Sequence, residues 1–158
     1  MANTQSMCTS FMGELLTATH NFGTAPIRAA TTADTFKGAL YLTSATINAA
    51  TTAYSATGEV TGTNYSAGGV TVTNATAPAS TNSSATAGVA YWTPSASLVY
   101  TNVTLSTAFD TVLIYNSTQS NKAVSVHTFG SQTITAGTFT LTMPSNTTTT
   151  ALLRLSTT

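Results

Sequence analysis

Apolar and polar residues alternate along most of the second half of this chain, which is the two-residue period of a strand with one face toward a core. This alternation predicts strands over residues 89–92, 98–105, 110–115, 123–129, 138–143 and 152–155. Two of the runs, TVLIY and KAVSVHTF, are separated by the polar turn 116–121, a pattern typical of a β-hairpin. We therefore expect most of the chain to fold as antiparallel sheet.

Upstream of this region, residues 35–43 predict one further strand, in which Phe36, Leu40 and Leu42 share a face. The opposite face carries Lys37, Ala39 and Tyr41. Another strand is expected to begin at Val70, directly after a glycine turn.

Near the N-terminus the period changes to that of a helix. Within residues 5–19, Met7, Phe11, Leu15 and Leu16 form one apolar stripe. Candidate capping residues are Asn3, Thr4 and Ser6. A helix this short needs a surface to pack against, which is either the sheet of its own domain or a neighbouring subunit.

Together these patterns predict one domain over residues 1–158. Its expected class is all-β, an antiparallel, jelly-roll-like β-sandwich with an N-terminal helix or arm over about residues 1–24. Long polar connections are expected over about residues 44–66 and 73–88. Connections of this length in a compact domain are often functional.

Charge is scarce: 5% of the residues are charged, against about 25% in ordinary soluble domains, and the net charge is zero. Such a surface lacks the charge repulsion that keeps copies apart, so it favours association. The basic residues Arg28, Lys37, Lys122 and Arg154 are scattered, which argues against a nucleic-acid partner. No apolar run is long enough to span a membrane, so no membrane partner is expected.

The N-terminal sequence MANTQSMCTS does not have the pattern of a secretory signal, so we expect synthesis in a cytoplasm without export. The single cysteine, Cys8, has no partner for an internal disulfide and is interpreted as a small buried apolar residue.

Candidate chemistry is sparse, and we expect no enzyme activity, no cofactor and no bound metal. The carboxylates are Glu14, Asp34, Glu59 and Asp110. Asp34 and Asp110 stand at strand entrances, where aspartate commonly binds turn backbone groups. Of the two histidines, His20 is interpreted as a capping or solvated residue and His127 as a hydrogen-bonded or half-exposed one. Two distant histidines and one cysteine match no known metal-ligand spacing.

The aromatic residues leave a second class of function open, a glycan-binding module of the adhesin type. They are Tyr41, Tyr54, Tyr65, Tyr91, Trp92, Tyr100 and Tyr115. Aromatic rings of this kind line sugar-binding platforms, but burial in a core or an interface explains them equally well.

Residues 35–72 resemble a pattern that recurs in small structural proteins of tailed bacteriophages. The matching positions are Thr35, Phe36, Lys37, Ala39, Leu40, Tyr41, Tyr54, Gly58, Glu59, Val60, Gly62, Thr63, Tyr65, Ala67, Gly68 and Gly69. The hairpin around residues 115–124 and the ending Leu152-Leu153-Arg154-Leu155 are similar as well, so the likeness covers about residues 34–155.

The resemblance implies a virion component, assembled in the host cytoplasm. A capsid decoration or cement protein is the first expectation, with the major capsid protein and further copies of itself, as a trimer, for partners. A tail-tube or head-to-tail joining protein is the alternative, but four carboxylates make a poor acidic lining for a DNA channel. The residues expected at the assembly interface are Met7, Phe11, Leu15, Leu16, Tyr54 and Tyr65.

Overall fold

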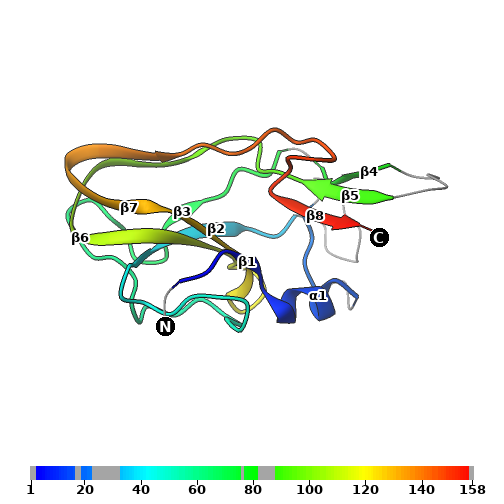
Figure 1. The fold of residues 1–158 in the computed structure, drawn as a ribbon, viewed down its shortest axis with the longest axis horizontal. Helices are drawn as coiled ribbons and strands as arrows, with labels where there is room; N and C mark the ends of the chain where they lie inside the picture. The colour runs from blue at the N-terminus through cyan, green and yellow to red at the C-terminus, as the bar shows by residue number, and fades with distance from the viewer. Residues whose placement is uncertain (1–2, 17–18, 23–32, 76, 82–87, 157–158) are drawn as a thin grey trace.

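The computed structural model describes residues 3–16, 19–22, 33–75, 77–81 and 88–156. Two antiparallel sheets and one short helix make up this part of the chain (Figure 1). In chain order the elements are β1 (Ser6–Met7), α1 (Thr9–Leu16), β2 (Phe36–Leu42), β3 (Val70–Thr71), β4 (Ala79–Ser80), β5 (Val89–Trp92), β6 (Leu98–Asn116), β7 (Lys122–Leu141) and β8 (Leu153–Ser156). The predicted all-β class is confirmed.

The larger sheet has the strand order β1-β7-β6-β2-β3, and the smaller sheet has the order β4-β5-β8. Strand β2 runs along the second half of β6, with Phe36 opposite Asn116 and Leu40 opposite Val112. Within the described residues, no helix is long and apolar enough to cross a membrane.

Strands β6 and β7 form one long hairpin, whereas the sequence pattern predicted four separate strands in this region. The polar and glycine-containing positions that were interpreted as breaks lie instead at irregularities of a continuous ladder. Asn102 and Ala136 adopt positive φ angles of 51° and 45° there, which marks bulges in the two strands. Bulges bend a strand without ending it but interrupt its apolar–polar alternation. For this reason the alternation alone did not reveal that β6 and β7 are continuous.

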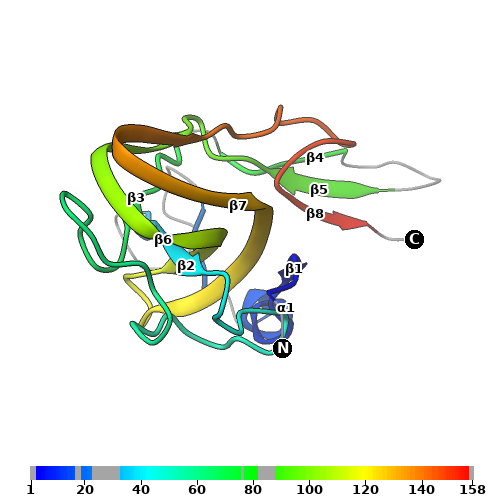
Figure 2. The same ribbon diagram turned by 60° about the vertical axis from the view of Figure 1, so that its left-hand side comes forward.

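Because it is bent, this hairpin folds back over itself, although both of its strands belong to the larger sheet. Figure 2 shows its two strands curling together. A Cβ atom added to Gly38 of β2 would lie 2.6 Å from Leu98 and 3.3 Å from Val112, which belong to opposite halves of β6. The hydroxyl of Tyr100 also donates a hydrogen bond to the Gly38 carbonyl at 2.8 Å. The first half of β6 therefore folds over the sheet that the second half of β6 builds with β2.

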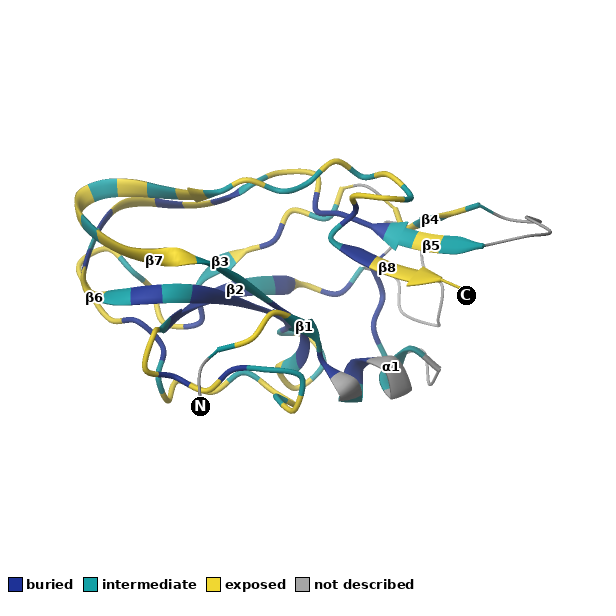
Figure 3. Ribbon diagram, viewed as in Figure 1, coloured by how far each residue is buried: buried dark blue, intermediate teal, exposed yellow. Residues whose placement is uncertain are grey.

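Side chains from both strands of the hairpin fill the space that its bend encloses. Phe109 makes edge-to-face contacts with Phe129 and Phe139, at centroid distances of 5.9 and 5.2 Å, and Phe139 also contacts Tyr100. The second half of β6 is buried almost continuously, as Figure 3 shows. One apolar core therefore runs from the bend to the smaller sheet.

The N-terminal region differs in detail from the predicted helix over residues 5–19. Ser6 and Met7 pair with β7 as strand β1, and the helix itself is limited to Thr9–Leu16. Asn3 does not cap it. Its amide binds the Leu42 carbonyl and Asp110, and its side-chain oxygen accepts the Ile47 amide, which ties the start of the chain to the end of β2.

The connection from residue 43 to residue 69 is long, as predicted, but it is anchored along its length. Ile47 and Val60 are buried, and isolated bridges join Tyr41 to Glu59 and Ala53 to Lys122. The connection therefore covers a face of β2. In the second long connection, over residues 73–88, Ala79–Ser80 form strand β4, and positions 76 and 82–87 lie outside the described residues.

Candidate functional site

An apolar pocket of about 150 Å³ lies between the N-terminal segment and the smaller sheet. It is lined by Met7, Phe11, Leu15, Phe22, Pro78, Ala90, Tyr91, Trp92, Leu153 and Leu155. Phe11 and Trp92 form its buried floor, at 2% and 3% exposure, and Leu155 forms a rim that is 43% exposed. We call these ten residues the apolar pocket.

The structure brings together three of the six residues expected at an assembly interface. Met7, Phe11 and Leu15 all line the apolar pocket. The side chain of Leu16 lies outside the described residues. Tyr54 and Tyr65 belong to a separate cluster around Glu59. The sequence pattern did not indicate that β5 and β8 supply the opposite wall, because the pairing of these strands is long-range.

Glu59 is the centre of the second cluster, and this residue is 6% exposed. One oxygen accepts a hydrogen bond from the hydroxyl of Tyr54 at 2.6 Å. The other oxygen accepts from the Tyr65 hydroxyl at 2.8 Å and from the Gly68 amide at 2.7 Å. Tyr54 also stacks on Tyr115, with ring centroids 4.7 Å apart. These contacts hold the connection 43–69 on the sheet.

The phenols of this cluster are donors and remain protonated. Burial, reinforced by the Glu59 carboxylate, raises the pKa of Tyr54 and of Tyr65 far above the ordinary phenol value. Burial also raises the pKa of Tyr41 and Tyr115 to about 12. None of these tyrosines can act as a base near neutral pH, so the arrangement is suited to structural support.

A third cluster surrounds His20. The sequence suggested a capping or solvated histidine, but the structure shows that this residue is buried. Its imidazole side chain is fully buried, with Nε2 2.7 Å from a Glu14 oxygen and Nδ1 3.1 Å from Nδ2 of Asn116. Nζ of Lys122 binds the other Glu14 oxygen at 2.6 Å. Asn116 also donates to Asp34 at 2.8 Å. No sequence motif signals this cluster, because its members come from three distant segments, residues 14–20, Asp34 and residues 116–122.

Burial lowers the pKa of His20, although the neighbouring carboxylates of Glu14 and Asp34 favour its charged form. Burial alone would raise the pKa of Glu14, but hydrogen bonds from Lys122 and His20 outweigh it and keep that pKa below the ordinary value. The cluster therefore combines an ionised carboxylate with a neutral imidazole.

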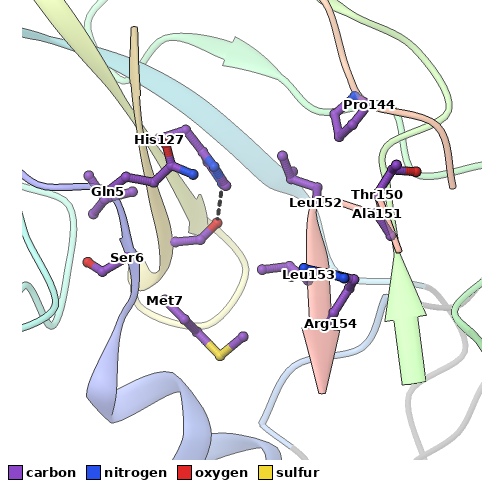
Figure 4. A pocket seen from close by; sticks show the side chains of 12 residues that line it. Gln5, Ser6, Met7, His127, Pro144, Thr150, Ala151, Leu152, Leu153 and Arg154 are labelled. Carbon is purple, nitrogen blue, oxygen red and sulfur yellow. Dashed lines mark hydrogen bonds between the residues drawn. The ribbon is translucent and has the colours of Figure 1, made fainter. Parts of the chain in front are cut away.

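A polar cleft of about 550 Å³ separates β1 and β7 from the segment 144–154 (Figure 4). His127 and Ser125 meet there, with Nε2 2.9 Å from Oγ. Ser125 is 1% exposed, and burial lowers the pKa of His127 to about 4. Among the described residues, no carboxylate lines the cleft. A serine–histidine pair with a covered hydroxyl and no carboxylate to orient the base does not have the geometry of a hydrolase triad.

Cys8 is fully buried and free, and burial raises its thiol pKa to about 11, so it is not an activated nucleophile. The part of the chain that the structure describes contains no group of three or more His, Cys, Asp or Glu side chains placed to hold a metal ion. Comparison of the chain with protein-family models, with curated proteins and with solved structures found no match.

Proposed function

We propose that this protein is a structural component of a bacteriophage virion, a capsid decoration protein that binds the outer surface of the head lattice beside further copies of itself. The observation that carries the proposal is where the residues of the phage-like pattern lie. Tyr54, Glu59, Tyr65 and Gly68, from the least regular part of that pattern, meet in one buried cluster that fastens a long connection to the sheet.

This placement supports a structural role because the pattern supplies internal support and not a binding site. The surface that remains for association is nearly uncharged, and the apolar pocket reaches solvent at Leu155. An apolar pocket that opens to solvent can receive an apolar side chain of a partner, so it offers a surface for protein contact. In this proposal the smaller sheet and the larger sheet, whose bent hairpin folds back over itself, form a jelly-roll-like sandwich.

The aromatic residues give less support to a glycan-binding module. Tyr41, Trp92, Tyr100 and Tyr115 are buried, and the hydroxyls of Tyr54 and Tyr65 are bound to Glu59. A sugar platform needs exposed ring faces, which the four buried rings do not offer. Tyr54 and Tyr65 each have one face stacked on a neighbouring ring, and Tyr91 is half-buried in the apolar pocket.

The number of copies per purified virion tests the proposal, measured by quantitative mass spectrometry against the major capsid protein. A number close to that of the shell protein is expected for a decoration protein. A far smaller number, in proportion to tail-tube or connector proteins, would move the protein to the tail or neck. Absence from the particles would overturn the virion proposal altogether.

A further inference from the structure

Helix α1 is joined to the β6–β7 hairpin by a polar contact that depends on one imidazole. Glu14 of α1 bonds to His20 and to Lys122, so the helix is held both to the chain that follows it and to the start of β7. The His20 ring also packs edge-to-face against Phe11 of α1, with centroids 4.8 Å apart. Phe11 belongs to the apolar pocket, and His20 therefore supports one wall of that pocket from behind.

The orientation of the Asn116 side-chain amide determines which ring nitrogen of His20 carries the proton. Oδ1 of Asn116 accepts hydrogen bonds from the backbone amides of Thr118 and Gln119, both at 3.1 Å. Its Nδ2 group must then face His20 and Asp34, as a donor to both. Nδ1 of His20 is accordingly an acceptor without a proton, and Nε2 carries the proton that is donated to Glu14.

A second proton on His20 would break this arrangement. The new Nδ1–H group would point at the NH₂ group of Asn116, and two donors cannot bond to each other. The side chain is fully buried, so water does not offer an alternative acceptor. The ring cannot turn away without moving against Phe11 and against Phe36, which stacks at 6.3 Å.

The charged groups around the ring do not remove this conflict. Among the described residues they are Glu14 from α1, Asp34 before β2 and Lys122 from β7. The two carboxylates attract an imidazolium and Lys122 repels it, but Glu14 binds Nε2, and Asp34 is separated from Nδ1 by the Asn116 amide, which donates to it. Protonation therefore costs either the Asn116 contact or the packing of α1.

We infer that His20 is a proton-sensitive latch, which holds α1 and the N-terminal wall of the apolar pocket in place when it is neutral and releases them on acidification. The importance of this latch for assembly rests on the proposed function, because only then is the pocket a docking surface. The latch itself does not depend on that function. It makes the contact surface of the protein responsive to pH.

Trp92, the single tryptophan of the chain, is a built-in probe of the latch. Its ring is 3% exposed on the floor of the pocket and packs 4.7 Å from Phe22. On acidification of the purified protein from about pH 7 to about pH 4.5, below the ordinary imidazole pKa of about 6.5, Trp92 emission should shift to the red. Residues 9–16 should lose hydrogen-exchange protection over the same range, while the far-ultraviolet sheet signal persists.

Two variants separate His20 from other acid effects. His20→Gln keeps one donor and one acceptor but does not titrate, so both changes should be absent in it. His127→Gln, which removes the other histidine, should behave as the wild type does. An identical acid response in His20→Gln, or no response in the wild type, would overturn the inference.

The ring nitrogens of the wild-type protein provide a measurement that does not depend on a variant that folds. Nitrogen-15 NMR at neutral pH should show His20 protonated at Nε2 and not at Nδ1, and a proton on Nδ1 would refute the latch. These experiments use isolated protein. If the latch is observed but the protein is absent from virions, the inference stands and the proposed function is rejected. If the protein is present in virions but the latch is not observed, the proposed function stands and the inference is rejected.

Discussion

At the scale of single residues, the structure depends on a few positions where only one side chain fits. Glu59 accepts three short hydrogen bonds in a buried place. Gly69 has a φ angle of +73°, and a Cβ atom there would lie 1.7 Å from the Gly38 carbonyl oxygen. Both residues belong to the phage-like pattern. At these two positions, the requirements of folding are sufficient to explain the residue.

Glu59→Gln should lower the free energy of unfolding by about 2 kcal/mol, because the three buried hydrogen bonds lose the charge of their acceptor. Denaturant unfolding measures this loss. Tyr54→Phe, which removes one donor and leaves the carboxylate two others, should cost about 1 kcal/mol. A larger loss in Tyr54→Phe than in Glu59→Gln would contradict the central role of the carboxylate.

Gly69→Ala should destabilise the protein by about 3 kcal/mol or more, because the added methyl group meets backbone in a left-handed conformation. The matched control is Gly130→Ala in β7, where an added Cβ has no atom within 4 Å. The control should change stability by less than about 0.5 kcal/mol. Equal losses in the two variants, measured by chemical denaturation, would show that the close approach at Gly69 is unimportant.

At the scale of elements, the bent β6–β7 hairpin sets the architecture. The sequence was sufficient to predict the short strand over residues 89–92 and the turn at 116–121, because both have local signals. It did not predict the bend, since bulges are formed by ordinary residues such as Asn102 and Ala136 in this chain. Bulge positions depend on how two strands register against each other, and that information is not periodic.

Ala136→Val should lower the free energy of unfolding by about 1–2 kcal/mol, because a β-branched residue is strained at the positive φ that the bulge needs. Thr135→Val at the neighbouring exposed strand position should change it by less than about 0.5 kcal/mol. Thermal unfolding of the two variants side by side tests the difference. A tolerated valine at 136 would mean that the bulge is not required.

The same limits apply to the candidate site. The stripe of Met7, Phe11 and Leu15 was visible in the sequence and lies together in the structure. The opposite wall and the His20 cluster were not visible, because they arise from contacts between distant segments. The pattern placed Tyr41 and Phe36 on opposite faces of β2, yet both residues are fully buried. Alternation cannot reveal a strand that is covered on both faces, as β2 is by the hairpin and by the connection 43–69.

At the scale of the whole molecule, pH should influence stability through the histidines. The folded-state pKa of His127 is about 4, below the value of about 6.5 expected in the unfolded chain. Between these values the unfolded state binds more protons, so stability should fall as pH decreases from about 6.5 to about 4 and be constant above. Denaturation midpoints across this range should decrease less steeply in His127→Gln. An unchanged slope would mean that His127 is already solvated in the folded protein.

Association with particles should depend on the rim of the apolar pocket. Leu155→Lys adds a charge to an exposed side chain in the pocket, so the amount of protein on purified virions should fall by about tenfold or more, equivalent to about 1.4 kcal/mol of binding free energy. Val99→Lys is the matched control, since Val99 is 44% exposed and lies outside the pocket. Equal occupancy of the two variants would exclude the pocket as the contact surface.

The bent hairpin also has a consequence for the order in which the chain folds. Its two strands span residues 98–141, a local stretch closed by a five-residue turn, and both β1 and β2 pair with it. Small loops close at lower entropic cost than large ones. We therefore expect the first half of a nascent chain to remain unfolded until the hairpin has been synthesised. Strand β2 and the N-terminal helix pack on this hairpin, which is complete only at residue 141.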